Sequence, residues 1–363
     1  MKLLTLYLLR NNLFLLFMSL MVGTGLYVLT DLFERLDFFL DASFGFLNIL
    51  WFYTLKVPFI VGQILPAVFL IAVIVQFCLM AKARETLALQ SGGVSPFVFL
   101  RFLFFYGVVW AVLQLALAQG LGVEGDRLST KIWREQIRGA ESHTVMRSLW
   151  FVDKTYVVHL GEADPVAGTG EGFLAYQISG DDKRMRQMIR ATSFSVSPSR
   201  DWRLYDATVI TPETYGYEVV PEMVIPLTQD LASFAAISPN TKPTHLPVWS
   251  LYDAISNLER SGSNVEVLRT TLHSRFAYAA SLIVMGIMGL ATVLWRSNVY
   301  LAVGVGLIIT FVFYGITTLC VSLGEKGILS PLVAAWFPVL LFFIMGLGSV
   351  LWHIRPQFRS QKL

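Results

Sequence analysis

Charged residues are scarce in this chain of 363 residues. Asp, Glu, Lys and Arg together make up 15% of it, whereas a soluble globular domain carries about 25%. Apolar residue types account for 55%, and the mean hydropathy is +0.60. We therefore expect segments that cross a membrane rather than one water-soluble domain.

Cysteine and histidine, which mark many metal and catalytic sites, are also few. The two cysteines, Cys78 and Cys320, fall inside apolar runs, so no disulfide is expected in the polar part of the chain. The five histidines have no metal-ligand spacing. Neither an H-E-x-x-H motif nor a G-x-S-x-G nucleophile elbow occurs. We predict no metal site and no catalytic residue.

A nucleotide-binding loop is missing as well. The stretch most similar to one, GLGVEGDR at 120–127, lacks the Lys-Ser/Thr pair that holds phosphates and magnesium. The apolar runs contain no carboxylates that could relay protons. A transport function would therefore need energy supplied by another protein.

Long apolar runs are what the sequence has instead. Each is about 20 residues or longer, enough to cross a bilayer as a helix. The runs without Asp, Glu, Lys or Arg cover 11–30, 57–81, 102–123, 276–295, 297–324 and 327–354. A cleaved signal peptide is the alternative for the first run, but its apolar part is too long and no small-residue cleavage site precedes Asp31. The pattern predicts six transmembrane helices, three on each side of a long polar insert.

The basic residues predict the orientation of these helices. Six spans place both termini on one side, where Glu85 is the single acid. The basic residues on that side are Lys2, Arg10, Lys82, Arg84, Arg101, Arg296, Arg355, Arg359 and Lys362. Because basic residues next to spans stay in the cytoplasm, both termini are predicted to be cytoplasmic. The pI of 8.8 then reflects topology, and we do not expect nucleic-acid binding.

The polar insert has the pattern of a small β domain outside the cytoplasm. Stretches such as WFVDKTYVVHL, MIRATSFSVS and WRLYDATVIT mix β-branched and aromatic residues and are separated by turn residues. They predict a sandwich or jellyroll. VWSLYDAISNLERSG then reads as an amphipathic helix that returns to the membrane. The predicted organisation is membrane helices 1–3 in residues 1–139, a β domain in 140–245, and the return helix with membrane helices 4–6 in 246–363.

A short charged segment, KARETLALQSGGVSP at 82–96, separates the second and third runs. Its spacing predicts a cytoplasmic helix over 82–95 that stops near Gly92-Gly93, with Ser95-Pro96 starting the next span. One interpretation is an interfacial helix that only connects two spans. The other is a coupling helix that docks into a cytoplasmic ATPase, with Glu85 pairing with a basic partner.

This segment resembles the coupling segment of the LptF/LptG lipopolysaccharide-export permease family. ETLALQSGGVS fits the family pattern of an acid, an apolar step, Gln or His, and small-Gly-x-Ser/Thr. The resemblance extends over nearly the whole chain through VPFIVGQILP, LHSRFA at 272–277 and LGEKGILSPLVAAWFP at 323–338. LYDAISNLERSG, and Gln rather than His in the coupling segment, are more similar to LptG than to LptF.

The resemblance implies an α-helical membrane protein with six transmembrane helices and an inserted periplasmic jellyroll-like domain. It implies a non-catalytic permease subunit that extracts lipopolysaccharide from the bacterial inner membrane. Its expected partners are a sister permease (LptF if this chain is LptG), a homodimer of the ATPase LptB, and the bridge proteins LptC and LptA. ATP and magnesium would bind to the ATPase, and this chain would hold no cofactor.

The resemblance also implies roles for residues of the coupling segment. Glu85 would contact an arginine of the ATPase. Arg84, Leu87, Leu89 and Gln90 would line the same groove. The alternative for Glu85 is a solvated helix acid that contributes less than about 1 kcal/mol.

Lipopolysaccharide contacts are expected on the first and fifth spans, which form lateral gates in the family. Aromatic residues there suit acyl chains: Phe33, Phe311, Phe313 and Tyr314. The phosphates would meet basic residues at the outer rim: Arg35, Lys56, Lys131 and Arg134. The sequence departs from LptG at TDLFERLDFF, which is acidic where several lysines are common. The alternative for the aromatic residues is ordinary packing or contact with membrane lipid. The alternative for the four basic residues is a solvated or interfacial charge.

Two other functions fit part of the pattern. A membrane sensor or assembly scaffold would bind a ligand through the β domain and recruit a partner through the cytoplasmic helix. A membrane-embedded enzyme acting on lipid would need a catalytic cluster near an interface, and the sequence contains none.

Overall fold

The computed structural model describes residues 2–42, 44–133, 137, 146–153, 155–164, 167–178, 185–196, 201–212, 216–227, 246–260 and 265–359. The chain divides into two compact units. The helical unit comprises Met1–Gly139 and Thr270–Leu363, and the inserted unit comprises Ala140–Arg269.

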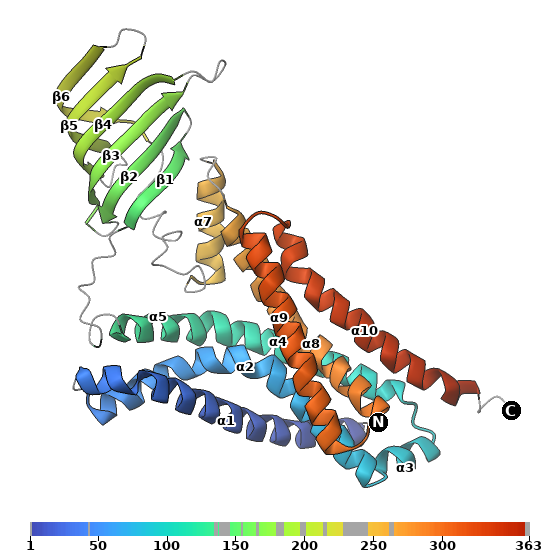
Figure 1. Cartoon of the computed structure of the whole chain (residues 1–363). Coiled ribbons are helices and arrows are strands. Elements are labelled where there is room, and N and C mark those ends of the chain that lie inside the picture. Colours follow the sequence, from blue (N-terminus) through green and yellow to red (C-terminus); the bar gives the residue numbers. More distant parts are fainter. Residues whose placement is uncertain are drawn as a thin grey trace. The chain divides into compact units, whose positions relative to one another are not determined.

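Long apolar helices make up the helical unit (Figure 1). They are α1 (Lys2–Asp41), α2 (Phe46–Lys82), α4 (Phe97–Leu117), α8 (Glu266–Trp295), α9 (Val299–Glu325) and α10 (Pro331–Arg359). A π-helical turn, η1 (Ala118–Gly122), continues α4 into α5 (Val123–Ile132), and the short α3 (Glu85–Ser91) lies between α2 and α4. Six helices in the described part of the chain are long and apolar enough to cross a membrane. The six-helix prediction is confirmed.

Helices α2 and α8 supply much of the core of this unit. Phe69 and Phe77 of α2 and Met285 of α8 are at most 2% exposed and pack in one apolar cluster. Helix α1 is different, since side chains such as Phe17 and Met21 are mostly exposed. Apolar side chains on the outside of a membrane helix contact lipid or another membrane chain at no cost in hydration.

Proline explains a polar contact inside the helical unit. Pro66 lies within α2 and has no N–H to bond to the carbonyl of Gly62. The side chain of Gln114, on α4, donates its Nε2 hydrogen to that carbonyl across 3.3 Å. Within a membrane, a freed backbone group is satisfied by neighbouring helices because water is absent. The proline in α2 thereby creates a specific contact with α4.

The next carbonyl of α2, that of Gln63, binds two further helices. It accepts hydrogen bonds from the hydroxyls of Tyr278 on α8 and Tyr314 on α9. The two hydroxyl oxygens are 3.0 Å apart. Four helices therefore meet at two adjacent carbonyls of α2.

Glycine allows α5 to lie directly against α2. A Cβ atom added at Gly125 would be 2.1 Å from the carbonyl oxygen of Leu55, closer than any real contact. At Gly122, one turn earlier, a Cβ would meet Pro58 and Phe59 backbone atoms at 3.7–3.8 Å. Gly122 is the last residue of the π-helical turn η1, and such turns change the phase of a helix.

The inserted unit contains a six-stranded antiparallel sheet followed by a helix. The strands are β1 (Met146–Asp153), β2 (Tyr156–Asp164), β3 (Thr169–Ile178), β4 (Met185–Val196), β5 (Trp202–Thr211) and β6 (Gly216–Ile225), and the helix is α7 (Val248–Arg260). The strand order in the sheet is the sequence order, with β1 and β6 at the edges (Figure 1). An all-β insertion between the third and fourth long helices is confirmed. The described strands follow an up-and-down order.

One face of this sheet is apolar and buried, as alternation along the strands requires. Phe173, Phe194 and Trp202 are at most 1% exposed. The rings of Phe194 and Trp202 stack with centroids 5.4 Å apart, and Phe173 lies edge-on to Phe194 at 5.8 Å. Aromatic residues from three adjacent strands thus build a core without any disulfide.

Candidate functional site

The candidate coupling site is α3 and the turn that precedes it. Helix α2 ends at Lys82, and Arg84 has a left-handed backbone with φ 59°. This conformation is unfavourable for a residue with a Cβ atom. It lets the chain turn sharply, so that Glu85 becomes the first residue of α3. At the other end, Gly93 has φ 81° and follows the last turn of α3.

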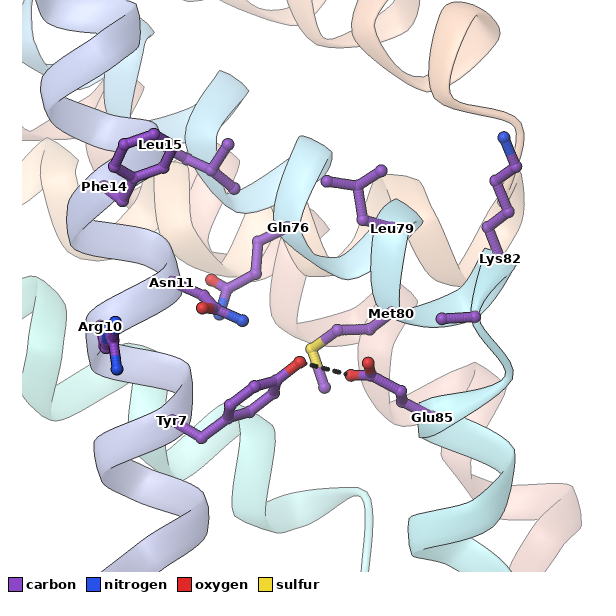
Figure 2. A pocket seen from close by; sticks show the side chains of 11 residues that line it. Tyr7, Arg10, Asn11, Phe14, Leu15, Gln76, Leu79, Met80, Lys82 and Glu85 are labelled. Atoms are coloured by element: carbon purple, nitrogen blue, oxygen red, sulfur yellow. Dashed lines mark hydrogen bonds between the residues drawn. The ribbon is translucent and has the colours of Figure 1, made fainter.

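Glu85 is held by α1. The Tyr7 hydroxyl donates a hydrogen bond to Glu85 Oε2 across 2.8 Å, although the two residues are 78 positions apart (Figure 2). The carboxylate has a second oxygen that can accept a hydrogen bond from another protein. The first turn of α3 is therefore tied to the first turns of α1.

The other predicted coupling residues lie on different faces of α3. Leu87 is 64% exposed, and Arg84 is also exposed. Leu89 packs against the helical core, and Gln90 is half-buried. Arg84 and Leu87 are exposed and Glu85 is partly exposed, while Leu89 anchors α3 to the unit.

A pocket of about 840 Å³ adjoins Glu85 between α1 and the end of α2 (Figure 2). Its lining includes Tyr7, Arg10, Phe14, Leu79, Lys82 and Glu85. Beside it, Asn12 Nδ2 donates to Gln76 Oε1 at 2.7 Å, and Gln76 Nε2 donates to the Leu8 carbonyl at 2.9 Å. This buried amide pair is a second polar link between α1 and α2.

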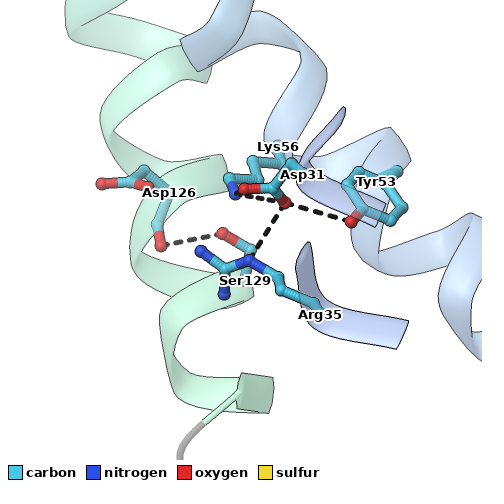
Figure 3. A network of polar contacts seen from close by, with 6 residues as sticks. All are labelled: Asp31, Arg35, Tyr53, Lys56, Asp126 and Ser129. Atoms are coloured by element: carbon cyan, nitrogen blue, oxygen red, sulfur yellow. Dashed lines mark hydrogen bonds and ion pairs between the residues drawn. The ribbon is translucent and has the colours of Figure 1, made fainter. Parts of the chain in front are cut away.

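A cluster of charges links the opposite ends of the same two helices (Figure 3). Lys56 Nζ lies 2.9 Å from each carboxylate oxygen of Asp31. Arg35 Nε is 3.1 Å from Asp31 Oδ2, and the Tyr53 hydroxyl donates to the same oxygen at 3.0 Å. Asp31 and Lys56 are only 9% and 7% exposed. The guanidinium of Arg35 also lies 4.3 Å from the ring centroid of Trp133.

This cluster changes the interpretation of the acidic sequence around the end of the first span. Asp31 is not an uncompensated acid, because two cations surround its carboxylate. Conversely, Lys56 is a buried ion-pair partner, while Arg35 is partly exposed. Lys131, in the last turn of α5, is exposed. Arg134 lies outside the described residues.

The aromatic residues expected to contact acyl chains are divided between surface and core. Phe33 and Phe311 are 67% and 77% exposed. Phe313 is 1% exposed and packs edge-on against Phe342, with centroids 5.3 Å apart. Tyr314 is partly buried and bonds to Tyr278 and Gln63. In this structure only the first two offer a surface to lipid.

Tyr7 and the polar side chains inside the spans are functional candidates that the sequence did not predict. Asn12, Gln76 and Gln114 lie within apolar runs and are at most 4% exposed. Buried amides in membrane helices are rare and pair with one another or with backbone groups. Their isolation in apolar sequence was a usable signal. Tyr7 gave no such signal, because tyrosine is common near the ends of membrane helices.

Among the described residues, no group of three His, Cys, Asp or Glu side chains could hold a metal ion. The architecture is that of a multi-pass membrane protein with an antiparallel sheet inserted between its third and fourth long helices.

A family model for the lipopolysaccharide export system permease LptF/LptG matches residues 6–353. The chain belongs to this permease family. A comparison with curated proteins gives no significant match. The family model covers both LptF and LptG, so the preference for LptG stays a prediction.

Proposed function

We propose that this chain is the permease subunit that extracts lipopolysaccharide from the bacterial inner membrane, driven by a separate cytoplasmic ATPase. The observation that carries the proposal is the family match over residues 6–353, which covers the inserted sheet and all or most of each of the six apolar helices. The chain itself would be non-catalytic, with ATP and magnesium bound by the LptB homodimer.

The coupling role of α3 is supported by how Glu85 is held. Tyr7 fixes one carboxylate oxygen and leaves the other able to pair with an arginine of the ATPase. Leu87 offers an apolar side chain on the exposed side of α3. A movement of α3 would reach α2 through the two-residue turn and α1 through the Tyr7 hydrogen bond.

The proposed orientation places both termini and α3 in the cytoplasm, because basic residues concentrate at those ends of the helices. The sheet then lies in the periplasm. Its edge strands β1 and β6 carry backbone groups to which a strand of LptC, LptA or the sister permease could add. We propose LptF as the sister permease.

The proposed lipid contacts follow from exposure and charge. Acyl chains would meet Phe33 on α1 and Phe311 on α9, which are exposed. Phosphates would meet Arg35 and Lys131 at the periplasmic end of α1 and α5. Lys56 would act indirectly, since its ammonium neutralises Asp31 beside Arg35.

Reconstitution of the purified complex with its ATPase in vesicles tests this function. We expect ATP-dependent release of lipopolysaccharide to an acceptor, and a sensor or scaffold would release none. Glu85→Ala should weaken ATPase docking and lower release about tenfold, the effect of one lost charge-assisted contact. Glu325→Ala, which removes an exposed acid at the C-terminal end of α9, is the matched control. Wild-type release by Glu85→Ala would contradict the role of α3.

A further inference from the structure

A glutamine amide is exposed within the charge-free run of α2. Gln63 follows Lys56 by seven residues and lies in the run 57–81, which contains no Asp, Glu, Lys or Arg. Its side chain is exposed. Water is absent from the core of a bilayer, so an amide there is costly unless a hydrogen bond satisfies it. An exposed glutamine at this depth therefore indicates that a polar group of another molecule meets α2 here.

The same side of α2 is covered on both sides of Gln63 along the helix. Residues seven apart are close to two turns apart and share one side of a helix. Lys56, two turns toward the start of α2, is buried against Asp31 of α1. Leu70, two turns toward the end, is 0% exposed and faces α9, where a Cβ added at Gly306 would lie 2.9 Å from its Cδ2 atom. Neighbouring helices thus cover this side of α2 at Lys56 and at Leu70 and leave it open at Gln63.

The backbone of Gln63 is fixed, although its side chain is exposed. Its carbonyl oxygen accepts hydrogen bonds from the hydroxyls of Tyr278 and Tyr314. The preceding carbonyl, that of Gly62, accepts one from Gln114. The exposed amide therefore extends from the point where four helices meet. A ligand that bonds to it needs no ordering of the backbone, which favours specific binding.

Charge, amide and aromatic surface follow one another inward from the proposed periplasmic end of α2. Arg35 and Lys56 lie at the rim. The Gln63 amide is about 10 Å deeper, at 1.5 Å per residue. Phe311, one turn of α9 before Tyr314 and 77% exposed, offers an aromatic ring deeper still. This order matches a lipid that carries hydrogen-bonding groups between an anionic headgroup and its acyl chains.

We propose that Gln63 selects lipopolysaccharide over the phospholipids of the membrane, an inference that rests on the proposed export function. The amide-linked 3-hydroxyacyl chains of lipid A carry N–H and O–H donors directly below the phosphorylated sugars. The ester groups of a glycerophospholipid at that depth only accept hydrogen bonds. Gln63 Oε1 accepts a hydrogen bond from a lipid A donor, and a phospholipid leaves this oxygen unpaired. A site that bonds to a donor rejects a ligand without one for this reason.

Lipid binding to the full complex without ATP, followed by native mass spectrometry, tests the proposal. The ligands are lipid A, an analogue with the same phosphates but ester-linked acyl chains without hydroxyls, and phosphatidylglycerol. We expect Gln63→Leu to lower the affinity for lipid A about five- to tenfold, the effect of one hydrogen bond, and to change the other two by less than about twofold. Thr54→Val, at an exposed position on the opposite side of α2, is the control and should change none of them. An equal loss for lipid A and the analogue, or no loss for lipid A, would overturn the proposal.

A second measurement identifies the molecule that lies beside residue 63. Gln63→p-benzoylphenylalanine, irradiated in native membranes, should give an adduct with lipopolysaccharide. An adduct only with a membrane protein or only with phospholipid would overturn the proposal. Failure of the export function has a different signature, because it would appear as a wild-type complex without ATP-dependent release. A complex that releases lipopolysaccharide while Gln63→Leu keeps the wild-type preference for lipid A would remove Gln63 alone.

Discussion

The ammonium of Lys56 lies 2.9 Å from both carboxylate oxygens of Asp31, in a site where both residues are less than a tenth exposed. The two residues come from different helices, α1 and α2. A buried pair of this kind contributes little compared with apolar residues of the same size, but the loss of one partner leaves an uncompensated charge.

Asp31→Ala should therefore destabilise the protein by about 3–5 kcal/mol, since Lys56 would remain buried without its counter-ion. Asp31→Ala/Lys56→Met should recover most of this loss. Thermal unfolding of the purified protein in detergent measures both. A double variant as unstable as Asp31→Ala would show that the charge of Lys56 is not the cause.

Gln114 should matter only because Pro66 is a proline. Gln114→Leu leaves the Gly62 carbonyl without a partner and should cost about 1 kcal/mol. In a Pro66→Ala background, residue 66 regains an N–H that can bond to Gly62, and Gln114→Leu should then be nearly neutral. Thermal unfolding of the four proteins gives the coupling energy between the two positions. The same cost in both backgrounds would contradict this account.

Two glycines of the η1–α5 segment should respond oppositely to alanine. Gly125→Ala places a methyl group against the Leu55 carbonyl and should destabilise by about 1–3 kcal/mol or more, as overpacking does. Gly120→Ala has no atom within 4 Å of the new Cβ and should be neutral or stabilising by up to about 1 kcal/mol. Thermal unfolding decides. Equal destabilisation would mean that backbone conformation, not the contact with α2, governs both positions.

Tyr7→Phe should loosen α3 without unfolding the helical unit, because it removes only the hydrogen bond to Glu85. Hydrogen exchange followed by mass spectrometry should show faster exchange of the α3 amides. Tyr300→Phe, at a position 89% exposed at the start of α9, serves as control. Unchanged exchange in α3 would mean that Leu89 packing alone positions this helix.

The helices and the sheet could be predicted because their signals are local. Runs without charge locate the membrane helices, and alternating β-branched and aromatic residues indicate the strands. Helix α1 nevertheless continues through acidic residues to Asp41, well past the charge-free run. Its length reflects packing, since Phe39 is buried among Phe52 and Trp133 rather than exposed at a helix end.

The candidate site depends on information that no local pattern contains. Whether Lys56 faces Asp31 or solvent depends on the rotation of α2 against α1, so both residues could be counted among free rim charges from sequence alone. The left-handed backbone of Arg84 could not be predicted from the sequence either, because glycine is the residue that usually marks such a turn. Tyr7 and Glu85 meet only after 78 residues of chain have folded back.

Helix α1 is fastened to α2 near both of its ends, by Tyr7 and Asn12 at one and by Asp31 at the other. Because the contacts lie far apart along the helix axes, α1 and α2 are expected to move together as one rigid body. During export, the interface between these two helices would therefore stay closed. We therefore expect a lateral path for lipid, if it passes beside α1, along the exposed side of this helix that carries Phe17 and Met21.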